Sequence, residues 1–397
     1  MDEPGVLQRQ RGRVWWGAGA AVAAVGWGAQ QFAPLLLMYR AELGVSGPTV
    51  QAVFAVYVVG LIPGLLFGGP VSDRYGRRPV VLAALAASLA ASALLLAGGH
   101  GVVWLFAGRL VAGFASGAGF SAGAAWVREL SAGTVDGGER GPRRATVAMT
   151  AGFGLGPLVA GVLAQWAPAR TVLPYLPHLL LALAALPLVR RTPETRSPVA
   201  GGGSLRLPDL SSRRFRTVVA PLAPWVFGTV AVGIAYLPGL VAPRLGGYVL
   251  IFCTLITLLG AAAGIAVVPL ARRVARAGSR RLLATALSIV VVGLLVAALA
   301  AATTDPLLVV AADLVLGAAY GCCQVCGLTE VQRIARPGQL AGLTAAYQAI
   351  SYLGLAAAVP LAAADHVVPP GVLLLGLAAL AALTLAVTSH AERSTGA

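Results

Sequence analysis

The chain has 397 residues, of which 58% are hydrophobic and 11% charged, whereas about a quarter of the residues of a soluble domain carry a charge. This composition excludes an ordinary soluble protein and indicates a membrane protein. The formal charge of +15 comes from arginine alone, because the sequence contains no lysine. These arginines lie in short stretches between apolar segments, so we expect no nucleic-acid partner.

Apolar runs of about 20 residues, the length that crosses a bilayer as a helix, occur twelve times. Six are expected before residue 190, at 14–37, 50–67, 79–97, 102–127, 146–166 and 172–189. Six more are expected at 217–240, 248–270, 282–302, 307–327, 340–362 and 367–389. The intervening segment contains seven arginines and the run Gly201–Ser204, as expected for a flexible linker.

We therefore predict an all-α integral membrane protein with 12 transmembrane helices, in which residues 1–190 form one six-helix bundle, 191–216 a linker and 217–397 a second bundle. Of the 29 arginines, 25 lie in the termini and alternate loops, so the positive-inside rule places both termini and the linker in the cytoplasm. The arginine, alanine and glycine content suggests a GC-rich bacterial genome and hence an inner (plasma) membrane. A monomer in a lipid bilayer is expected.

The first span, 14–37, contains Gln30 and Gln31, at least one of which should face the protein interior. Spans two and three are joined by a short charged hairpin with the sequence Gly69-Pro-Val-Ser-Asp73-Arg74-Tyr-Gly76-Arg77-Arg78-Pro79. Gly69 and Gly76 permit a tight left-handed backbone, and Pro79 suits the first turn of the next helix. Asp73 is expected to pair locally or to cap a helix N-terminus.

This hairpin resembles the loop between helices 2 and 3 of the major facilitator superfamily of transporters. The shared pattern is Gly, two residues, a small residue, Asp, Arg, any residue, Gly and two basic residues. The resemblance implies a fold of two six-helix bundles with a substrate cavity between them. It also implies that the hairpin is a conformational latch, in which Asp73 meets the N-terminus of helix 11, near residues 339–343, in one state.

The fourth span carries Arg109, and the tenth span carries Asp313 at the corresponding position of an internal repeat. Arg109, Gly113 and Gly117 align with Asp313, Gly317 and Gly321 at an offset of 204 residues. The resemblance implies that these two spans line the cavity, so the two charges are candidates for proton coupling or for a charge pair. Asp313 is the first candidate for a proton-carrying carboxylate, because burial favours its neutral form and a nearby arginine its charged form.

Two alternatives to this role of Asp313 remain open. The two charges could form a permanent ion pair that holds the halves together. Proton coupling could also rest on Asp73, on Glu129 or on Glu330, which lie near the ends of spans, or could be absent.

The fifth span contains Gly152, Gly156, Pro157 and Gly161. Glycines at this spacing strip one helix face of side chains, and the proline favours a bend. The pattern resembles that of drug:proton antiporters within the superfamily, although Ala160-Gly161 stands where the family has two glycines. The first span also departs from similar antiporters, since it has Gln30 and Gln31 where they carry an acid.

Aromatic and amide side chains of several spans are candidates for the substrate cavity, with packing or interfacial anchoring as the alternative for each. They are Trp27, Gln30, Gln31, Phe114, Trp225, Tyr236, Tyr320 and Gln324. His178 is expected at the interface or at the rim of the pore. The four cysteines lie within spans and are expected to pack rather than to form disulfides or a metal site.

The sequence contains no nucleophile elbow, phosphate-binding loop or dinucleotide fingerprint in a suitable context, so we do not expect an enzyme, a cofactor or a metal. The prediction is a secondary transporter that exports small organic, drug-like or amphipathic molecules, by proton antiport with alternating access. A proton-coupled importer of a small metabolite on the same fold is one alternative. A membrane sensor or scaffold without transport is another.

Overall fold

The computed structural model describes residues 14–132, 137–196, 210–336 and 339–393, and these are helical with short connections. Within these ranges there is no β-strand. Eleven helical segments among the described residues are long and apolar enough to cross a bilayer. Gly201–Ser204 and most of the predicted linker lie outside the described residues, so the structure does not test that part of the prediction.

Eleven candidate segments stand where the sequence predicts twelve spans, because one of them, Phe215–Arg276, has 62 residues. About 20 residues suffice for one crossing. This segment includes the predicted spans 217–240 and 248–270, and its backbone adopts a left-handed φ of 52° at Gly246, between them. Its helices are α9 (Ala220–Val230), α10 (Leu237–Leu245), α11 (Val249–Ala266) and α12 (Val268–Arg276). The count of twelve crossings stays a prediction.

By their contacts, the described residues divide into two compact units. Unit 1 contains those of Met1–Phe32 and Val56–Leu205, and unit 2 contains those of Ala33–Ala55 and Arg206–Ala397. Residues 33–55, which the sequence places in the first bundle, therefore group with the second unit. Each unit has its own set of buried apolar side chains.

Residues 33–55 join unit 2 because the first predicted span is interrupted. Helix α2 (Trp16–Gln30) ends before Gln31, and the chain continues as a short turn, Ala33–Leu35, and then as α3 (Leu36–Leu43). The turn and α3 both pack against α11 of unit 2. The segment then enters α4 (Gly47–Tyr75), whose buried Gln51 donates a hydrogen bond of 2.6 Å to the Ala235 carbonyl. Trp16–Leu43 is still one candidate membrane span, as the sequence predicts for 14–37, but its helix is interrupted at residues 31–35.

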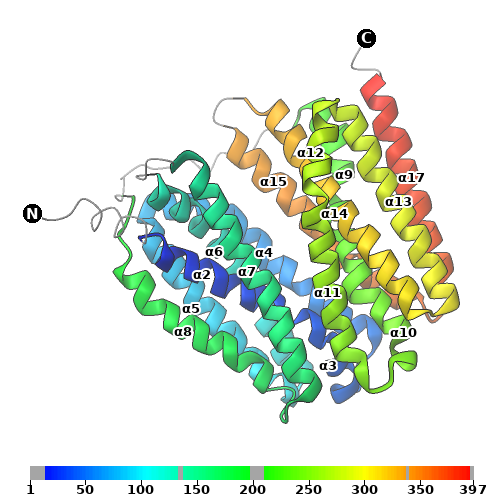
Figure 1. The fold of residues 1–397 in the computed structure, drawn as a ribbon, viewed down its shortest axis with the longest axis horizontal. Helices are drawn as coiled ribbons and strands as arrows, with labels where there is room; N and C mark the ends of the chain where they lie inside the picture. Colours follow the sequence, from blue (N-terminus) through cyan, green and yellow to red (C-terminus); the bar gives the residue numbers. More distant parts are fainter. Residues whose placement is uncertain (1–13, 133–136, 197–209, 337–338, 394–397) are drawn as a thin grey trace, which may run out of the picture. The chain divides into compact units, whose positions relative to one another are not determined.

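Unit 1 is arranged around α2, which packs against α5, α6, α7 and α8 (Figure 1). Helix α5 also packs along α6 and against α8. The bounds of these helices are α5 (Arg77–Leu96), α6 (Val102–Ser131), α7 (Gly137–Trp166) and α8 (Leu176–Arg191). Because α2 is surrounded on several sides, its small residues, such as Ala18, Ala21 and Ala24, are buried.

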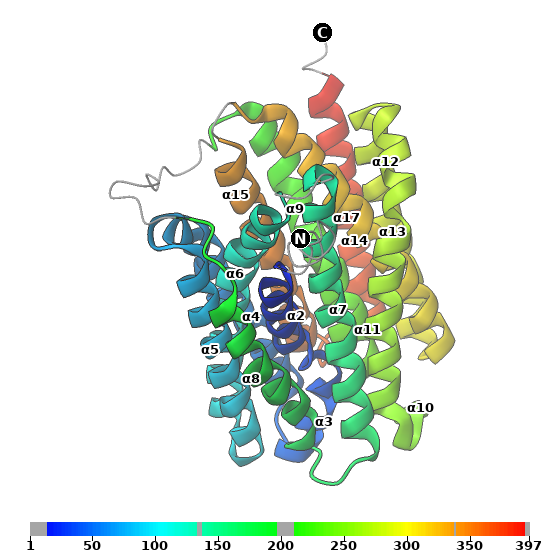
Figure 2. The same cartoon turned by 60° about the vertical axis from the view of Figure 1, so that its left-hand side comes forward.

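Unit 2 is arranged around α14, which packs against α9, α11, α13 and α15 (Figures 1 and 2). Helix α17 covers α13. The bounds are α13 (Ser279–Thr303), α14 (Pro306–Ile334), α15 (Leu340–Leu353), α16 (Ala358–Ala364) and α17 (Pro370–Arg393).

The same glycine-mediated helix contact occurs once in each unit. In unit 1, a Cβ atom on Gly117 of α6 would lie 2.5 Å from the Leu65 nitrogen of α4. In unit 2, a Cβ atom on Gly317 of α14 would lie 2.8 Å from the Gly260 Cα of α11. Gly113 and Gly321 face the same neighbouring helices. Glycine at these positions lets the backbones approach closely, as in other membrane helix pairs.

We expect Gly317→Ala to destabilise the protein, because its methyl group would overlap the backbone of α11. Overpacking of this kind costs about 1–3 kcal/mol. Gly376→Ala on α17 is the matched control, since a Cβ atom there meets no described atom within 4 Å. The midpoint of thermal unfolding of the purified protein should fall for Gly317→Ala and should not fall for Gly376→Ala. Equal midpoints for the two variants would contradict the close contact.

Candidate functional site

Arg109 lies on α6 and is only 2% exposed. Its Nη1 donates a hydrogen bond of 3.1 Å to the carbonyl of Ala29, in the last turn of α2. Carbonyls of a last helical turn lack partners within their own helix, so this arginine satisfies one of them at the negative end of the helix dipole. The guanidinium also lies over the rings of Phe32 and Tyr57, 5.0 and 4.4 Å from their centroids.

Asp313 lies on α14 and is also 2% exposed. Its carboxylate fits against two glycines, Gly233 in the π-helical turn Ala231–Tyr236 and Gly260 in α11. A Cβ atom on Gly233 would lie 2.5 Å from Oδ1, and one on Gly260 would lie 2.8 Å from Oδ2. Any larger residue at either position would displace the carboxylate. We call this space the glycine slot.

Within the described part of unit 2, Asp313 Oδ2 has no hydrogen-bond partner, and no ion pair of the carboxylate is formed there. A buried carboxylate that is ionised and unpaired is costly. The slot therefore holds an acid without the cation that ordinarily accompanies buried acids in proteins.

The surroundings of the two charges are related by the internal repeat. Gly233 lies 204 residues after Ala29, and Gly260 lies 203 residues after Tyr57. Arg109 and Asp313 thus contact equivalent positions of equivalent helices, one pair in each unit. At one pair of these equivalent positions, the aromatic ring of Tyr57 lies beside Arg109, whereas Gly260 lies beside Asp313.

The predicted hairpin links α4 to α5 in unit 1. Gly76 has the left-handed φ of 100° that the sequence predicts, and α5 begins at the next residue, Arg77. Arg77 is 5% exposed and forms ion pairs with Asp73 at 2.7 Å and with Glu129 of α6 at 2.8 Å. Asp73 therefore pairs locally in this structure. It also lies 3.5 Å from Arg196.

The other hairpin residues lie at the surface or the backbone of this turn. The prediction of a left-handed backbone at Gly69 is wrong, because this residue lies inside α4, which continues to Tyr75. Gly69 has open space where a Cβ atom would stand, and its carbonyl accepts a hydrogen bond from Ser72. Arg74 lies over the ring of Tyr75, 5.3 Å from its centroid. Arg78 donates to the carbonyl of Arg190 at 3.4 Å.

Glu194 caps the N-terminus of α5, the helix that follows the hairpin. The sequence analysis did not identify this residue. Its carboxylate accepts hydrogen bonds from the backbone N–H groups of Arg77 at 2.9 Å and Arg78 at 2.8 Å, at the N-terminus of α5. A carboxylate there satisfies free N–H groups and complements the helix dipole. Because Glu194 is more than a hundred residues away, in the predicted linker, no local pattern could indicate the contact.

A second charge cluster lies in unit 2. Glu330 of α14 is 1% exposed and pairs with Arg214 at 2.6 Å and with Arg333 at 3.2 Å. Both arginines also bond to Ser279 at the start of α13. Glu129 and Glu330, the two glutamates considered for proton coupling, are therefore both held by arginine within their own units.

The candidate cavity residues of unit 1 differ in exposure. Gln31 is fully buried and donates to Ser92 of α5 at 2.8 Å. Gln30 and Trp27 are partly buried, and among the described residues the indole Nε1 of Trp27 has no hydrogen-bond acceptor. Phe114 is 49% exposed. No hydrogen bond or ring contact joins these four side chains to one another in the described part of the unit.

The candidate cavity residues of unit 2 also have different partners from one another. Trp225 donates to Thr384 of α17 at 3.2 Å, which gives it a packing role. Tyr320 lies against Phe227, with 5.4 Å between ring centroids, and Gln324 receives a long hydrogen bond of 3.5 Å from Tyr347. The sequence analysis missed Phe227 and its neighbour Tyr352, whose rings stack at 4.0 Å. Their positions on α9 and α15 give no local signal of this contact.

Tyr236 is 3% exposed, and its hydroxyl has no hydrogen-bond partner among the described residues. It lines a cavity within unit 2, together with Arg40, Gln51 and Asp365.

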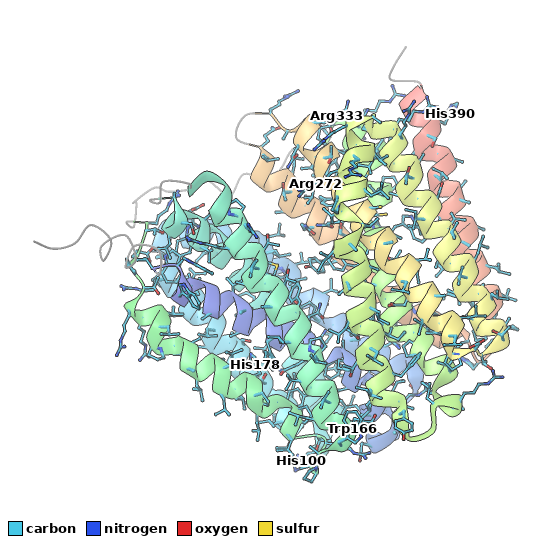
Figure 3. The ribbon with its side chains drawn as sticks, viewed as in Figure 1. His100, Trp166, His178, Arg272, Arg333 and His390 are labelled. Carbon is cyan, nitrogen blue, oxygen red and sulfur yellow. The ribbon has the colours of Figure 1, made fainter. Side chains whose placement is uncertain are left out.

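The sequence predicts His178 at the interface or at the rim of the pore, but in the structure its side chain is fully buried in unit 1. Figure 3 labels its position. Its Nδ1 lies 2.8 Å from the Ser92 hydroxyl and its Nε2 lies 3.2 Å from the Ser88 hydroxyl, both on α5. Gly28 of α2 leaves room for the ring, since a Cβ atom there would lie 2.7 Å from Nε2. Two serines and a glycine thus create a polar slot that the sequence spacing did not reveal.

Two glycines of the fifth predicted span, Gly152 and Gly156, face α2. A Cβ atom on Gly152 would lie 2.8 Å from the Trp27 nitrogen, and one on Gly156 would lie 2.8 Å from the Trp27 oxygen. Pro157 lies inside α7, and both it and Gly161 are buried. These residues allow α7 and α2 to pack closely.

A family model described as Major Facilitator Superfamily matches residues 17–359 of the chain. The chain is also similar to multidrug resistance protein MdtL of Klebsiella pneumoniae, with 34% identity over 76 residues, which are 19% of each protein. The chain thus matches about a fifth of the length of that curated relative.

Two solved structures share the fold. One is the peptide transporter POT, with a TM-score of 0.77, 14% identity and coverage of 96% of this chain and 95% of that chain. The other is a D-xylose–proton symporter, with a TM-score of 0.72, 16% identity and coverage of 94% and 96%. At this level of identity the likeness concerns the fold alone.

We expect Glu194→Ala to lower stability by about 0.5–2 kcal/mol, the usual cost of losing a helix cap. Glu42→Ala on α3 is the matched control, because it removes an exposed carboxylate. Thermal unfolding of the two purified variants would be compared. If both variants unfold at the temperature of the unchanged protein, the cap contributes nothing to stability.

Proposed function

Because the chain belongs to the major facilitator superfamily, we propose that it is a secondary active transporter that exports small organic molecules in exchange for protons. It is a multi-pass membrane protein and not an enzyme. Export is favoured by the similarity of a short segment to a multidrug resistance protein and by the glycine–proline pattern of α7. Drug-like or amphipathic compounds are the substrate class that follows from these two features.

We place the proton on Asp313. Of the four acids considered for coupling, Asp73 and Glu129 pair with Arg77, and Glu330 pairs with two arginines. Asp313 alone among these four lies in a slot whose described neighbours in the same unit provide no cation. This difference is the observation that carries the proposal.

The chemistry follows from the cost of burying charge. Protonation neutralises Asp313 and makes its place in the glycine slot favourable. When alternating access admits water to the slot, the carboxylate can release its proton and be solvated. Proton binding and conformation are then linked, which is the requirement for antiport. Arg109 supplies a fixed positive charge at the equivalent position of unit 1.

The same proposal includes the topology. The segment Phe215–Arg276 crosses the membrane twice, which gives twelve crossings, and both termini face the cytoplasm of a bacterial cell. The protein acts as a monomer, with residues 1–190 and 217–397 as the two bundles. The remaining candidate cavity residues, such as Phe114 and Tyr320, contact the substrate.

Proton exchange through Asp313 can be measured in everted membrane vesicles that carry a proton gradient and a fluorescent pH probe. Addition of a transported compound from a panel of hydrophobic cations, antibiotics and neutral metabolites should dissipate the gradient. We expect Asp313→Asn to abolish this response, because an amide cannot carry the proton. Asp305→Asn is the matched control on the same helix, where the side chain caps α14 and asparagine caps equally well.

Other outcomes of this assay decide between the alternatives. If Asp313→Asn responds like the unchanged protein, the aspartate is structural and the coupling role is refuted. If a metabolite enters right-side-out cells together with protons, the protein is an importer. If no compound gives flux in either direction, a sensor or scaffold replaces the transporter.

The hairpin gives a second prediction about transport. We propose that Asp73 exchanges its local pairing with Arg77 for the N-terminus of α15 during the transport cycle. Gln339, the N-cap residue of α15, does not cap that end with its own side chain. Asp73→Asn should therefore slow transport while the amount of protein in the membrane, measured by immunoblot, stays unchanged. A loss of protein from the membrane would indicate a role in folding instead.

A further inference from the structure

Unit 2 contains a cavity of about 500 Å³ that is separate from the glycine slot. This volume is within the range of sites for small molecules. All of its lining residues belong to unit 2. They come from α3 and the start of α4, from the region Tyr236–Leu240, and from the end of α16.

Two buried polar side chains of this cavity have atoms without a partner. Gln51 is 5% exposed and donates its Nε2 to the Ala235 carbonyl. Because that carbonyl can only accept, the amide must present its other atom, the acceptor Oε1, elsewhere. Oε1 and the hydroxyl of Tyr236 are both buried, and neither has a hydrogen-bond partner among the described residues. Such atoms are ordinarily satisfied, so a ligand is a reason for their presence.

The cavity also has two opposite charges that do not pair with each other in the described structure. Arg40 of α3 lies over Gly47, where a Cβ atom would be 3.6 Å from its Cζ. Asp365 follows the end of α16 and lines the same cavity as Tyr236. No ion pair joins Arg40 and Asp365 within 4.0 Å, as far as the described residues show. The remainder of the lining is mostly apolar, with Leu37, Val50, Leu240 and Ala362, and it also includes the polar side chains Ser46 and His366.

We propose that this cavity binds a small zwitterion with an ammonium group, a carboxylate group and an apolar side chain, as in an α-amino acid. The ammonium group donates to Asp365, to Gln51 Oε1 and to the Tyr236 hydroxyl. The carboxylate pairs with Arg40. A purely cationic ligand would be repelled by Arg40, and a purely anionic one by Asp365.

L-leucine is a suitable probe because two analogues keep its branched side chain but only one of its two charged groups. 3-Methylbutylamine lacks the carboxylate, and 4-methylpentanoate lacks the ammonium group. Radiolabelled leucine would be equilibrated with the purified full-length protein in detergent, and the analogues would compete. We expect saturable binding of leucine and competition by each analogue that is weaker by about tenfold or more, as for the loss of one charge-assisted interaction.

Variants of the two charged residues test the site directly. Arg40→Gln and Asp365→Asn should each weaken leucine binding by about tenfold or more. Arg244→Gln is the matched control, since Arg244 is exposed, lies outside the lining and is the repeat equivalent of Arg40 at an offset of 204 residues. Tyr236→Phe, which removes only the hydroxyl, should weaken binding to a smaller extent.

Several results would overturn the proposal. Leucine that does not bind saturably, or that binds equally to Arg40→Gln and Asp365→Asn, excludes the site. An amine or a carboxylate analogue that competes as well as leucine itself shows a cation or an anion site instead. The competition experiment uses the unchanged protein, so it decides the question even where a variant does not fold. Binding is measured without a proton gradient, so the result does not depend on whether the protein exports anything.

Discussion

Glycine residues bring a helix of each unit into direct contact with the backbone of a neighbouring helix. Gly117 brings α6 onto α4 in unit 1, and Gly317 brings α14 onto α11 in unit 2. Because glycine has no side chain, the two helix backbones approach closely at these contacts. Arg109 and Asp313, which lie two turns and one turn away from these glycines, are therefore held against the neighbouring helix. Arg109 and Asp313 are buried for this reason, although burial of a charge is costly. The glycines thus determine both the packing and the electrostatics.

The internal repeat shows how one packing scheme gives two different chemical environments. Beside Arg109, the neighbouring helices provide a carbonyl and two aromatic rings, which stabilise a cation. Beside Asp313, the equivalents of Ala29 and Tyr57 are Gly233 and Gly260, which provide room but no charge. Arg109 is suited to remain charged through a cycle, whereas Asp313 gains most from binding a proton. This asymmetry distinguishes a fixed charge from a changeable one.

Acids elsewhere in the molecule are held differently. Glu129, Glu330 and Glu194 each meet arginine side chains or the N–H groups of a helix N-terminus, and these contacts organise the ends of the helices. The zwitterion cavity adds a third situation, in which Arg40 and Asp365 face one space without neutralising each other. The charges of the chain therefore occur in three settings: paired at the ends of helices, isolated in the glycine slot and separated across one cavity. The proposed proton binding and the proposed ligand recognition rest on the second and third settings.

The membrane class, the helical repeat at an offset of 204 residues and the turn at Gly76 could be predicted from the sequence, because they depend on composition, hydrophobic length and local backbone preference. Arg109 and Asp313 could also be identified in this way, since a charge within an apolar span is conspicuous. The break after α2, the burial of His178, the capping by Glu194 and the cavity around Gln51 became visible in the folded structure. These depend on contacts between residues tens to hundreds of positions apart, which local patterns do not encode. The glycine slot needed both, because its residues are visible in the sequence but their convergence is a matter of packing.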